Sequence, residues 1–229
     1  MPKLIVADDH PLFRTALTHA IRGILADSET LEADAFDSTC EVLEQNPDVD
    51  LLLLDLHMPG SYGFLGLIQL RKQYPTLPIL VISASEDIDV IRRVMAFGAS
   101  GYVSKSAKPA DIGAALNAVL AGDLWVPPEM RQSVLDQGED PADLDLADRV
   151  AQLTQQQYKV LYYLTEGWLN KQIAYDLNIS EATVKAHMTA IFRKLGVSNR
   201  TQVVIEAQRL KLEPPVDRAL AQQGDEVSE

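Results

Sequence analysis

The first 125 residues alternate short apolar runs with amphipathic stretches of helical period. The apolar runs predict five strands, at Leu4–Ala7, Leu31–Phe36, Leu51–Leu54, Ile79–Ser83 and Gly101–Ser104. The amphipathic stretches predict helices near residues 12–25, 38–45, 62–74, 88–97 and 110–121. Two of the runs, Leu51–Leu54 and Ile79–Ile82, are apolar on both faces, as is typical of central parallel strands covered by helices. The pattern therefore predicts a doubly wound α/β domain over residues 1–122.

The rest of the chain predicts a different architecture. From Val126 to Asp148 the sequence turns acidic and loses its apolar period, so we expect an acidic linker over residues 123–148, with a short helix around 129–136. Helical periods then recur near residues 155–166, 171–177, 181–195 and 200–210. They predict a second, all-α domain of four helices over residues 149–212. Residues 213–229 carry two prolines and scattered charge, and we expect a disordered tail there.

The net charge of −13 is distributed unevenly. Residues 1–125 hold 9 Lys and Arg against 17 Asp and Glu, and residues 126–148 hold 1 against 7. Residues 149–212 hold 9 against 4, a net charge of +5, and residues 213–229 hold 1 against 5. The second domain is therefore the one segment whose charge favours nucleic-acid phosphates.

Two absences in the sequence limit the class of protein. There is no run of eighteen apolar residues and no basic, apolar N-terminal leader, so we expect a cytoplasmic protein without membrane association. Cys40 is the only cysteine, which excludes an internal disulfide and a cysteine-based zinc cluster. We interpret Cys40 as a small buried or half-buried apolar residue.

Residues suited to phosphoryl chemistry follow four of the five predicted strands. The first strand ends in Asp8-Asp9, the third in Asp55, the fourth in Ser83 and the fifth in Lys105. Each residue alone is common in a solvated turn or at a helix start. Ligands of an open parallel sheet, however, bind beyond the carboxyl ends of its strands. The joint placement therefore predicts one site at that edge.

Three carboxylates in one crevice repel each other, and burial would raise their pKa values unless a cation compensates. Mg²⁺ suits that role because it binds a few carboxylates and keeps positions for water and phosphate oxygens. We expect Asp8 and Asp9 to hold the metal, directly or through water. Asp55 would both ligate it and attack phosphorus, giving an aspartyl phosphate. Lys105 would supply positive charge to the phosphoryl oxygens, and Ser83 a hydroxyl donor.

Three stretches together resemble the receiver domain of NarL/FixJ response regulators: VADDHPLFR at 6–14, LDLHMPG at 54–60 and GASGYVSK at 98–105. The resemblance implies a parallel sheet in the order 2-1-3-4-5, with Asp55 as phosphoacceptor and the backbone carbonyl of His57 completing the metal shell. It also implies that Ser83 and Tyr102 form a switch pair, in which the hydroxyl moves to the phosphate and the ring turns inward. An ordinary strand aromatic is the alternative for Tyr102.

Two residues near the predicted site have their own interpretation. We expect His10 to help begin the first helix, with Pro11 in its first turn. Many receivers have a proline after a cis bond where this chain has Ser106. The NarL-type branch often lacks that proline, so the difference does not count against the predicted function.

The second domain contains a pair of helices of helix-turn-helix proportions, joined by residues 178–180. Ser180 suits the N-cap of the helix 181–195. One face of that helix carries an apolar stripe, formed by Val184, Met188, Ile191 and Leu195. Lys185, Thr189 and Arg193 lie off the stripe, where they can face a DNA groove. A solvated basic face is the ordinary alternative.

The stretches NKQIA at 170–174, ISEATVKAH at 179–187 and KLGVSNRT at 194–201 resemble the LuxR-type helix-turn-helix over about residues 150–210. The resemblance implies that the helix 181–195 enters the major groove with Lys185, Ala186 and Thr189 towards the bases. Lys185 would pair with guanine acceptors, and Ala186 and the Thr189 methyl would meet a thymine methyl. The remaining candidate DNA-binding residues are Thr183 and the phosphate-contacting Lys171, Arg193, Lys194 and Arg200.

Two further features of the second domain follow from the same resemblance. Gln157 stands where the family usually has a glutamate, and we expect an exposed cap or polar contact there. The last helix, Thr201–Leu210, would supply a dimer face, although core packing has an equal claim on its apolar residues.

We therefore predict a two-component response regulator, a sequence-specific DNA-binding transcription regulator controlled by phosphorylation of Asp55. It would catalyse only its own phosphoryl transfer and dephosphorylation. The expected partners are a sensor histidine kinase, a double-stranded DNA operator and, in the active state, a second copy of the chain. RNA polymerase is a further candidate partner. The alternative is an orphan regulator of the same fold that acts independently of phosphorylation.

A phosphatase or hydrolase that uses Asp55 on small substrates is disfavoured. Such enzymes generally need a second acid two residues after the nucleophile. This chain has His57 at that place.

Overall fold

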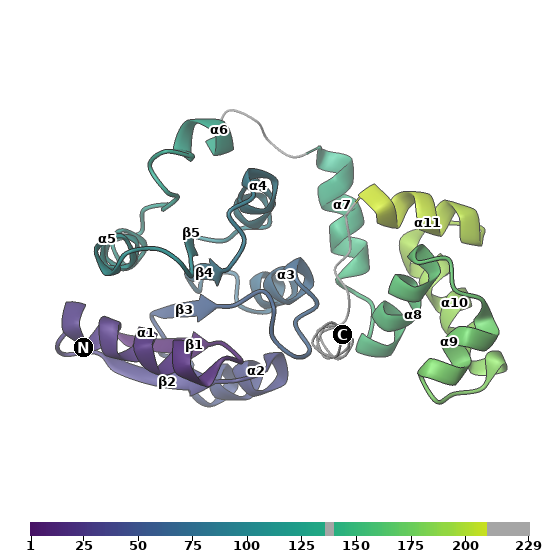
Figure 1. Ribbon diagram of the computed structural model, residues 1–229, viewed down its shortest axis with the longest axis horizontal. Helices are drawn as coiled ribbons and strands as arrows, with labels where there is room; N and C mark the ends of the chain where they lie inside the picture. Colours follow the sequence, from purple (N-terminus) through teal and green to yellow (C-terminus); the bar gives the residue numbers. More distant parts are fainter. Residues whose placement is uncertain (136–139, 210–229) are drawn as a thin grey trace, which may run out of the picture. The chain divides into compact units, whose positions relative to one another are not determined.

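The structure is a computed structural model that describes residues 1–135 and 140–209 of the chain. The chain divides into two compact units, the first within residues 1–139 and the second within residues 140–229 (Figure 1). The expected disordered tail lies outside the described residues. Among the residues that are described, no helix combines the length and the apolar character needed to span a membrane.

The first unit is built on a parallel sheet of five strands in the order β2-β1-β3-β4-β5, as predicted. The strands are β1 (Lys3–Ala7), β2 (Glu29–Ala33), β3 (Leu51–Leu54), β4 (Ile79–Ser83) and β5 (Gly101–Ser104). The central strands β3 and β4 are buried along their whole length, because helices cover both of their faces. All five strands therefore end at one edge of the sheet.

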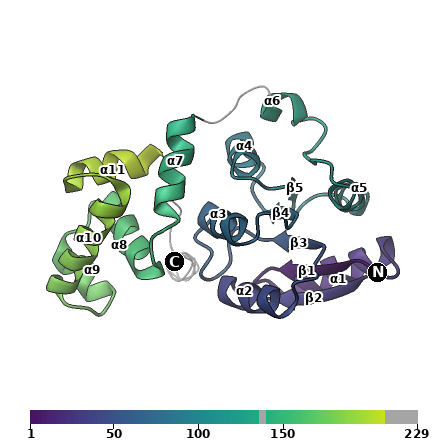
Figure 2. The same ribbon diagram turned by 180° about the vertical axis from the view of Figure 1, so that it is seen from behind.

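Helices cover the two faces of this sheet (Figure 1; from behind in Figure 2). Their bounds are α1 (Pro11–Ile24), α2 (Phe36–Gln45), α3 (Phe64–Gln73), α4 (Ile88–Ala96) and α5 (Pro109–Leu120). Leu17 and Ile21 of α1 share one core cluster with Leu116 of α5. Leu43 of α2, with residues of α3 and α4, belongs to the other cluster. The sheet thus lies between two apolar layers, and its strand ends are left free to carry a site.

The second strand differs from its predicted position. The sequence predicts Leu31–Phe36, whereas β2 spans Glu29–Ala33 and Phe36 begins α2. β2 pairs with a single neighbour at the edge of the sheet, so it tolerates polar residues such as Glu29 and Thr30. The prediction followed the apolar residues and was therefore displaced towards the helix.

The stretch 123–148, expected to be an acidic linker, contributes to both units. Trp125 forms an isolated parallel bridge with Gly101, and its carbonyl accepts a hydrogen bond from the Tyr102 amide at 2.9 Å. The short helix α6 (Arg131–Leu135) matches the helix expected around 129–136. Val126 and Val134 are buried in the core cluster that contains α4. This part of the stretch therefore extends the packing of the first unit beyond β5.

The second unit consists of helices in its described part. They are α7 (Pro141–Val150), α8 (Gln155–Thr165), α9 (Asn170–Asp176), α10 (Glu181–Leu195) and α11 (Arg200–Arg209). The last four match the predicted helices within one residue at each end. Their core is fully buried, with Tyr158 and Leu161 from α8, Ile173 from α9 and Ile191 from α10.

The sequence prediction missed α7 because its acidic residues suggested a solvated linker. The Asp140 carboxylate caps the helix by accepting a hydrogen bond from the Ala142 amide at 2.8 Å, and Pro141 occupies the first turn. Leu146 and Val150 lie one turn apart and are buried. An Asp-Pro start before apolar residues four apart is the sequence signal that could have revealed this helix.

We predict that Gly101→Ala lowers the free energy of unfolding of the first unit by about 1–3 kcal/mol. A Cβ at this position would lie 2.9 Å from the Trp125 carbonyl oxygen and 3.0 Å from Leu80 Cδ1. Calorimetric or urea unfolding measures the change. The control is Gly23→Ala in α1, where a Cβ meets nothing within 4 Å. That variant should be stabilised by roughly 0.5–1 kcal/mol. Equal stability of Gly101→Ala and the parent would contradict the close pairing of Trp125 with β5.

Candidate functional site

The predicted acidic residues meet at the carboxyl edge of the sheet. Asp8 follows β1 and Asp55 follows β3, and these two strands are neighbours in the sheet. The Asp55 amide donates to the Ala7 carbonyl at 2.9 Å, which extends the ladder to the site itself. Asp8 is 1% exposed and Asp55 is 2% exposed. Two carboxylates are thus buried at adjacent strand ends. Their negative charges need a cation nearby, because burial disfavours the charged form.

Lys105 supplies a positive charge to both carboxylates. Its Nζ atom lies 2.7 Å from Asp8 Oδ2 and 2.8 Å from Asp55 Oδ2. The same Nζ lies 4.9 Å from the centre of the Phe13 ring, within the range of a cation–π contact. The structure therefore brings together Lys105 and the acids that follow β1 and β3, as the sequence predicts.

The shared ammonium group changes the acid–base behaviour of the site. Burial raises the pKa of Asp55, and the neighbouring Asp8 adds to this effect, while Lys105 opposes it. Burial by itself lowers the pKa of Lys105, but hydrogen bonds and charges from Asp55 and Asp8 outweigh it, so that pKa lies above its ordinary value. Lys105 consequently stays charged at neutral pH.

Four side chains of the site could hold a metal ion. Ligand atoms of Asp8, Asp9, His10 and Asp55 all lie within 4.8 Å of one another. Three of these residues are carboxylates, the ligands that Mg²⁺ prefers, so the donor set fits this ion. His10 is the N-cap of α1, as expected, and Pro11 lies in the first turn.

The ring of His10 is a part of the site that the sequence prediction missed. Its Nδ1 lies 2.6 Å from Asp9 Oδ1 and 3.3 Å from Asp8 Oδ1. The direct succession Asp8-Asp9-His10 after a strand is the signal that could have suggested it.

His57 contacts Asp55 mainly through its backbone amide. Its amide donates to Asp55 Oδ1 at 3.2 Å, and its side chain is 47% exposed. This hydrogen bond orients the Asp55 carboxylate. The predicted metal role of the His57 carbonyl stays a prediction.

Ser83 and Tyr102 lie close together on β4 and β5. Both are fully buried, and the register pairs Tyr102 with Val81, two residues before Ser83. Burial raises the pKa of Tyr102 to about 12, against a hydrogen bond with Ser83 that lowers it. The Tyr102 hydroxyl also donates to the carbonyl of Ser85, in the loop after β4. The tyrosine ring thus lies inward and ties β5 to that loop.

A cavity of about 360 Å³ gives access to Asp55. It is lined by His10, Leu12, Phe13, Asp55, His57, Ala84 and Lys105. A cavity of this size can admit a phosphoryl group and the group that donates it.

In the second unit, α9 and α10 form the helix-turn-helix. Asn178 takes the left-handed conformation, with φ of 51°, in the turn between them. The Ser180 side chain accepts a hydrogen bond from the Thr183 amide at 3.0 Å and so caps α10, as predicted. Gly196 ends the helix at a φ of 70°.

One face of α10 is exposed. Of its predicted apolar stripe, Val184, Ile191 and Leu195 are fully buried. The exposed residues include the predicted base-facing positions Lys185, Ala186 and Thr189. Two other candidate DNA contacts of this helix, Thr183 and Arg193, are exposed as well. Lys171 is exposed on α9. A basic helix with such an exposed face has the dimensions to enter a major groove.

Two predicted phosphate contacts are engaged within the unit instead. Lys194 Nζ donates to the Gln152 carbonyl at 2.7 Å and to Gln157 Oε1 at 2.8 Å. The Arg200 guanidinium donates to the Trp168 carbonyl at 2.5 Å. Gln157 also accepts from the Thr154 amide at 3.2 Å, so it makes the polar cap contact expected at this position.

Comparisons with known proteins identify the family of each unit. Residues 4–117 match the family of response regulator receiver domains, and residues 151–207 match the bacterial regulatory proteins of the luxR family. The "glycerol metabolism activator" of Pseudomonas putida is 40% identical over 210 residues, covering 90% of this chain and 95% of that protein. The chain is a response regulator.

More distant relatives place it within the same family. Oxygen regulatory protein NreC of Staphylococcus carnosus is 30% identical over 218 residues, which cover 92% of this regulator and 98% of NreC. A solved structure of the RcsB response regulator of Salmonella typhimurium matches this chain with a TM-score of 0.53 at 25% identity. It covers 90% of this chain and 98% of RcsB. Its description concerns conformational dynamism for DNA interaction. The regulator therefore joins a receiver domain to a LuxR-type DNA-binding domain, as the NarL/FixJ resemblance predicted.

We predict that Lys194→Ala lowers the free energy of unfolding of the DNA-binding unit by about 1–2 kcal/mol, because two hydrogen bonds of α10 are lost, one to the Gln152 carbonyl before α8 and one to Gln157 in α8. Lys185→Ala, which removes the same charge from an exposed position of the same helix, should change it by less than about 0.5 kcal/mol. Urea unfolding followed by tryptophan fluorescence, to which Trp168 contributes from this unit and Trp125 from the first, measures both. Equal stability of the two variants would contradict a structural role for Lys194.

Proposed function

We propose that a sensor histidine kinase phosphorylates Asp55 and that this modification controls the binding of the second unit to a DNA operator. The observation that supports it best is the Lys105 ammonium, held 2.8 Å from the Asp55 carboxylate and 2.7 Å from Asp8 beside a cavity. A nucleophilic carboxylate next to a fixed cation is the arrangement that phosphoryl transfer requires.

Asp8, Asp9 and Asp55 would hold Mg²⁺, with the His57 carbonyl as a further ligand. When bound, this ion neutralises charge on the oxygens of the transferring phosphoryl group. The carboxylates present supply more negative charge than Lys105 alone compensates, which is the condition for binding a divalent cation.

The residues of the chain perform the transfer itself. An Asp55 carboxylate oxygen forms a bond to phosphorus, while the bond between phosphorus and the imidazole nitrogen of the donor breaks and leaves the electron pair on that nitrogen. Lys105 would exchange its contact with Asp55 for one with a phosphoryl oxygen. The Ser83 hydroxyl would donate to another oxygen, and Tyr102 would respond because it shares a hydrogen bond with Ser83.

The exposed face of α10 would read DNA. Lys185 would pair with guanine acceptors, and Ala186 and the Thr189 methyl would contact a thymine methyl. Thr183, Lys171 and Arg193 would add contacts around them, largely to phosphates. Lys194 and Arg200 are less suited to this role, because their donors already serve the fold.

The active regulator would pair with a second copy on a two-fold operator, with α11 as the dimer face. Ile205 of α11 is 55% exposed, an apolar side chain available to such a contact. RNA polymerase is a further proposed partner, and the proposed place of action is the cytoplasm, where the operator DNA lies.

We predict that acetyl phosphate with Mg²⁺ converts the protein to a single aspartyl phosphate and that Asp55→Asn abolishes the product, because the amide is no nucleophile. Phosphate-affinity electrophoresis of the full chain measures the product. Removing Mg²⁺ with a chelator should abolish it as well. An equal yield from Asp55→Asn would refute Asp55 as the acceptor and leave the orphan regulator as the better account.

For DNA, we predict that Arg193→Ala weakens binding to all sequences alike and reduces the slope of log K against log[salt] by about 0.9, the value for one phosphate contact on B-DNA. Lys185→Ala should instead lose roughly 1–3 kcal/mol of discrimination between the operator and a mismatched site. Fluorescence anisotropy on both duplexes, at several salt concentrations, measures the two effects. If Arg193→Ala also removed the discrimination, the assignment of phosphate and base contacts would be wrong.

A further inference from the structure

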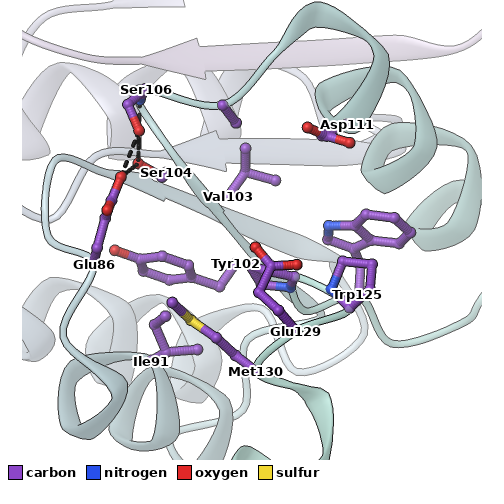
Figure 3. Close-up of a pocket in the computed structure, with 13 residues that line it drawn as sticks. Glu86, Ile91, Tyr102, Val103, Ser104, Ser106, Asp111, Trp125, Glu129 and Met130 are labelled. Atoms are coloured by element: carbon purple, nitrogen blue, oxygen red, sulfur yellow. Dashed lines mark hydrogen bonds between the residues drawn. The ribbon is translucent and has the colours of Figure 1, made fainter.

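A cavity of about 250 Å³ lies beside β5 (Figure 3). Tyr102, Ile91 and Met130 contribute apolar walls. Glu86, Ser104 and Ser106 line the same cavity and are joined by hydrogen bonds. These three residues form the Glu86 clasp.

The clasp joins two loops that end neighbouring strands. The Ser106 hydroxyl donates to Glu86 Oε1 at 2.5 Å, and the Ser104 hydroxyl donates to the same oxygen at 3.2 Å. The two hydroxyls are also 2.8 Å apart. Glu86 belongs to the loop after β4, Ser104 is the last residue of β5 and Ser106 lies in the loop that follows. One carboxylate oxygen therefore accepts hydrogen bonds from both serines.

Lys105 lies between the two serines of the clasp. Its amide donates to the Ser83 carbonyl at 2.8 Å, which holds the backbone at one point. Its side chain leaves in the direction of Asp8 and Asp55. Ser106 lacks the ring by which a proline would restrict the backbone after Lys105. The hydrogen bond from Ser106 to Glu86 supplies a restraint in its place.

The charge state of Glu86 agrees with this arrangement. Hydrogen bonds from Ser106 and then Ser104 lower its pKa, so the acceptor is an ionised carboxylate at neutral pH. Hydrogen bonds to an ionised acceptor are shorter and stronger than those between neutral groups. Glu129, the other glutamate lining the cavity, is exposed and has no hydrogen bond to the β5 loop among the described contacts.

We infer that the Glu86 clasp positions Lys105 for phosphoryl transfer to Asp55. The inference rests on the proposed function of Asp55. Glu86, Ser104 and Ser106 are positioning residues, because they act on the reacting atoms through Lys105. Since Glu86 follows Ser83 by three residues, a shift of Ser83 towards a phosphoryl group would also strain the hydrogen bonds of the clasp.

The test compares Glu86→Ala and Ser106→Ala with the parent, as full chains, using acetyl phosphate and Mg²⁺. Both variants should form the aspartyl phosphate roughly five- to fiftyfold more slowly, because a misplaced cation stabilises the transferring group less well. Their affinity for Mg²⁺, measured by calorimetry without phosphodonor, should stay at the parent value. Loss of folding would lower both quantities, so this split identifies a positioning effect.

Conservative variants and a matched acid supply the controls. Glu86→Gln keeps an acceptor oxygen and Ser106→Thr keeps the hydroxyl, so both should recover most of the parent rate. Glu129→Ala removes an acid from the same cavity without touching the clasp, and its rate should equal that of the parent. If Glu129→Ala slowed the reaction as much as Glu86→Ala, the charge of the cavity and not the clasp would be responsible, and the inference would fail.

Hydrogen exchange separates the clasp from the proposed function. The amides of residues 104–107 should exchange faster in Glu86→Ala and Ser106→Ala than in the parent and in Glu129→Ala. Unchanged exchange would overturn the clasp whatever the phosphorylation result. An absence of aspartyl phosphate in the parent, combined with faster exchange in the variants, would overturn the role of Asp55 and with it the role assigned to the clasp in the transfer.

Discussion

The ammonium group of Lys105 between two buried carboxylates is the interaction on which the site depends. Asp8 and Asp55 are almost fully removed from water, and each lies less than 3 Å from Lys105 Nζ. Without that cation the two acids would repel each other in a medium that already disfavours their charged forms. The site has a net charge of two negative units when the carboxylates of Asp8, Asp9 and Asp55 are summed with the Lys105 ammonium. A divalent cation balances this charge and can then bind phosphoryl oxygens.

The strand order explains why this cation stands at the end of a long side chain. β5 is separated from β3 by β4, and neighbouring strands lie about 4.8 Å apart, so a residue after β5 must reach across roughly 10 Å to meet Asp55. Only a long side chain does this, and its position depends on the backbone from which it starts. Backbone pairing with Ser83 and the polar contacts around Lys105 therefore matter as much as the charge itself.

The sequence predicted those parts whose physical cause is local. Leu51–Leu54 is apolar on both faces, and the strand has these bounds. Ser180 has the side chain of an N-cap and is one. The errors arise where tertiary packing decides. β2 is polar because it lies at the sheet edge, α7 is acidic but buries Leu146 and Val150, and Lys194 resembles a phosphate contact until Gln157 is found beside it. The hydrogen bonds of Glu86 depend on distances that no pattern of residues contains. The ring of His10 was missed although its place directly after Asp8-Asp9 is a sequence signal.

In the proposed mechanism, phosphate on Asp55 changes the affinity of the second unit for DNA. It is tested most directly by titrating one operator duplex with the full chain, with and without beryllofluoride and Mg²⁺ as a stable substitute for the phosphoryl group. If phosphorylation controls the second unit, the parent binds the duplex more tightly with beryllofluoride, and Asp55→Asn shows no such difference. Equal affinity in both conditions for the parent, with beryllofluoride shown to be bound, would contradict it.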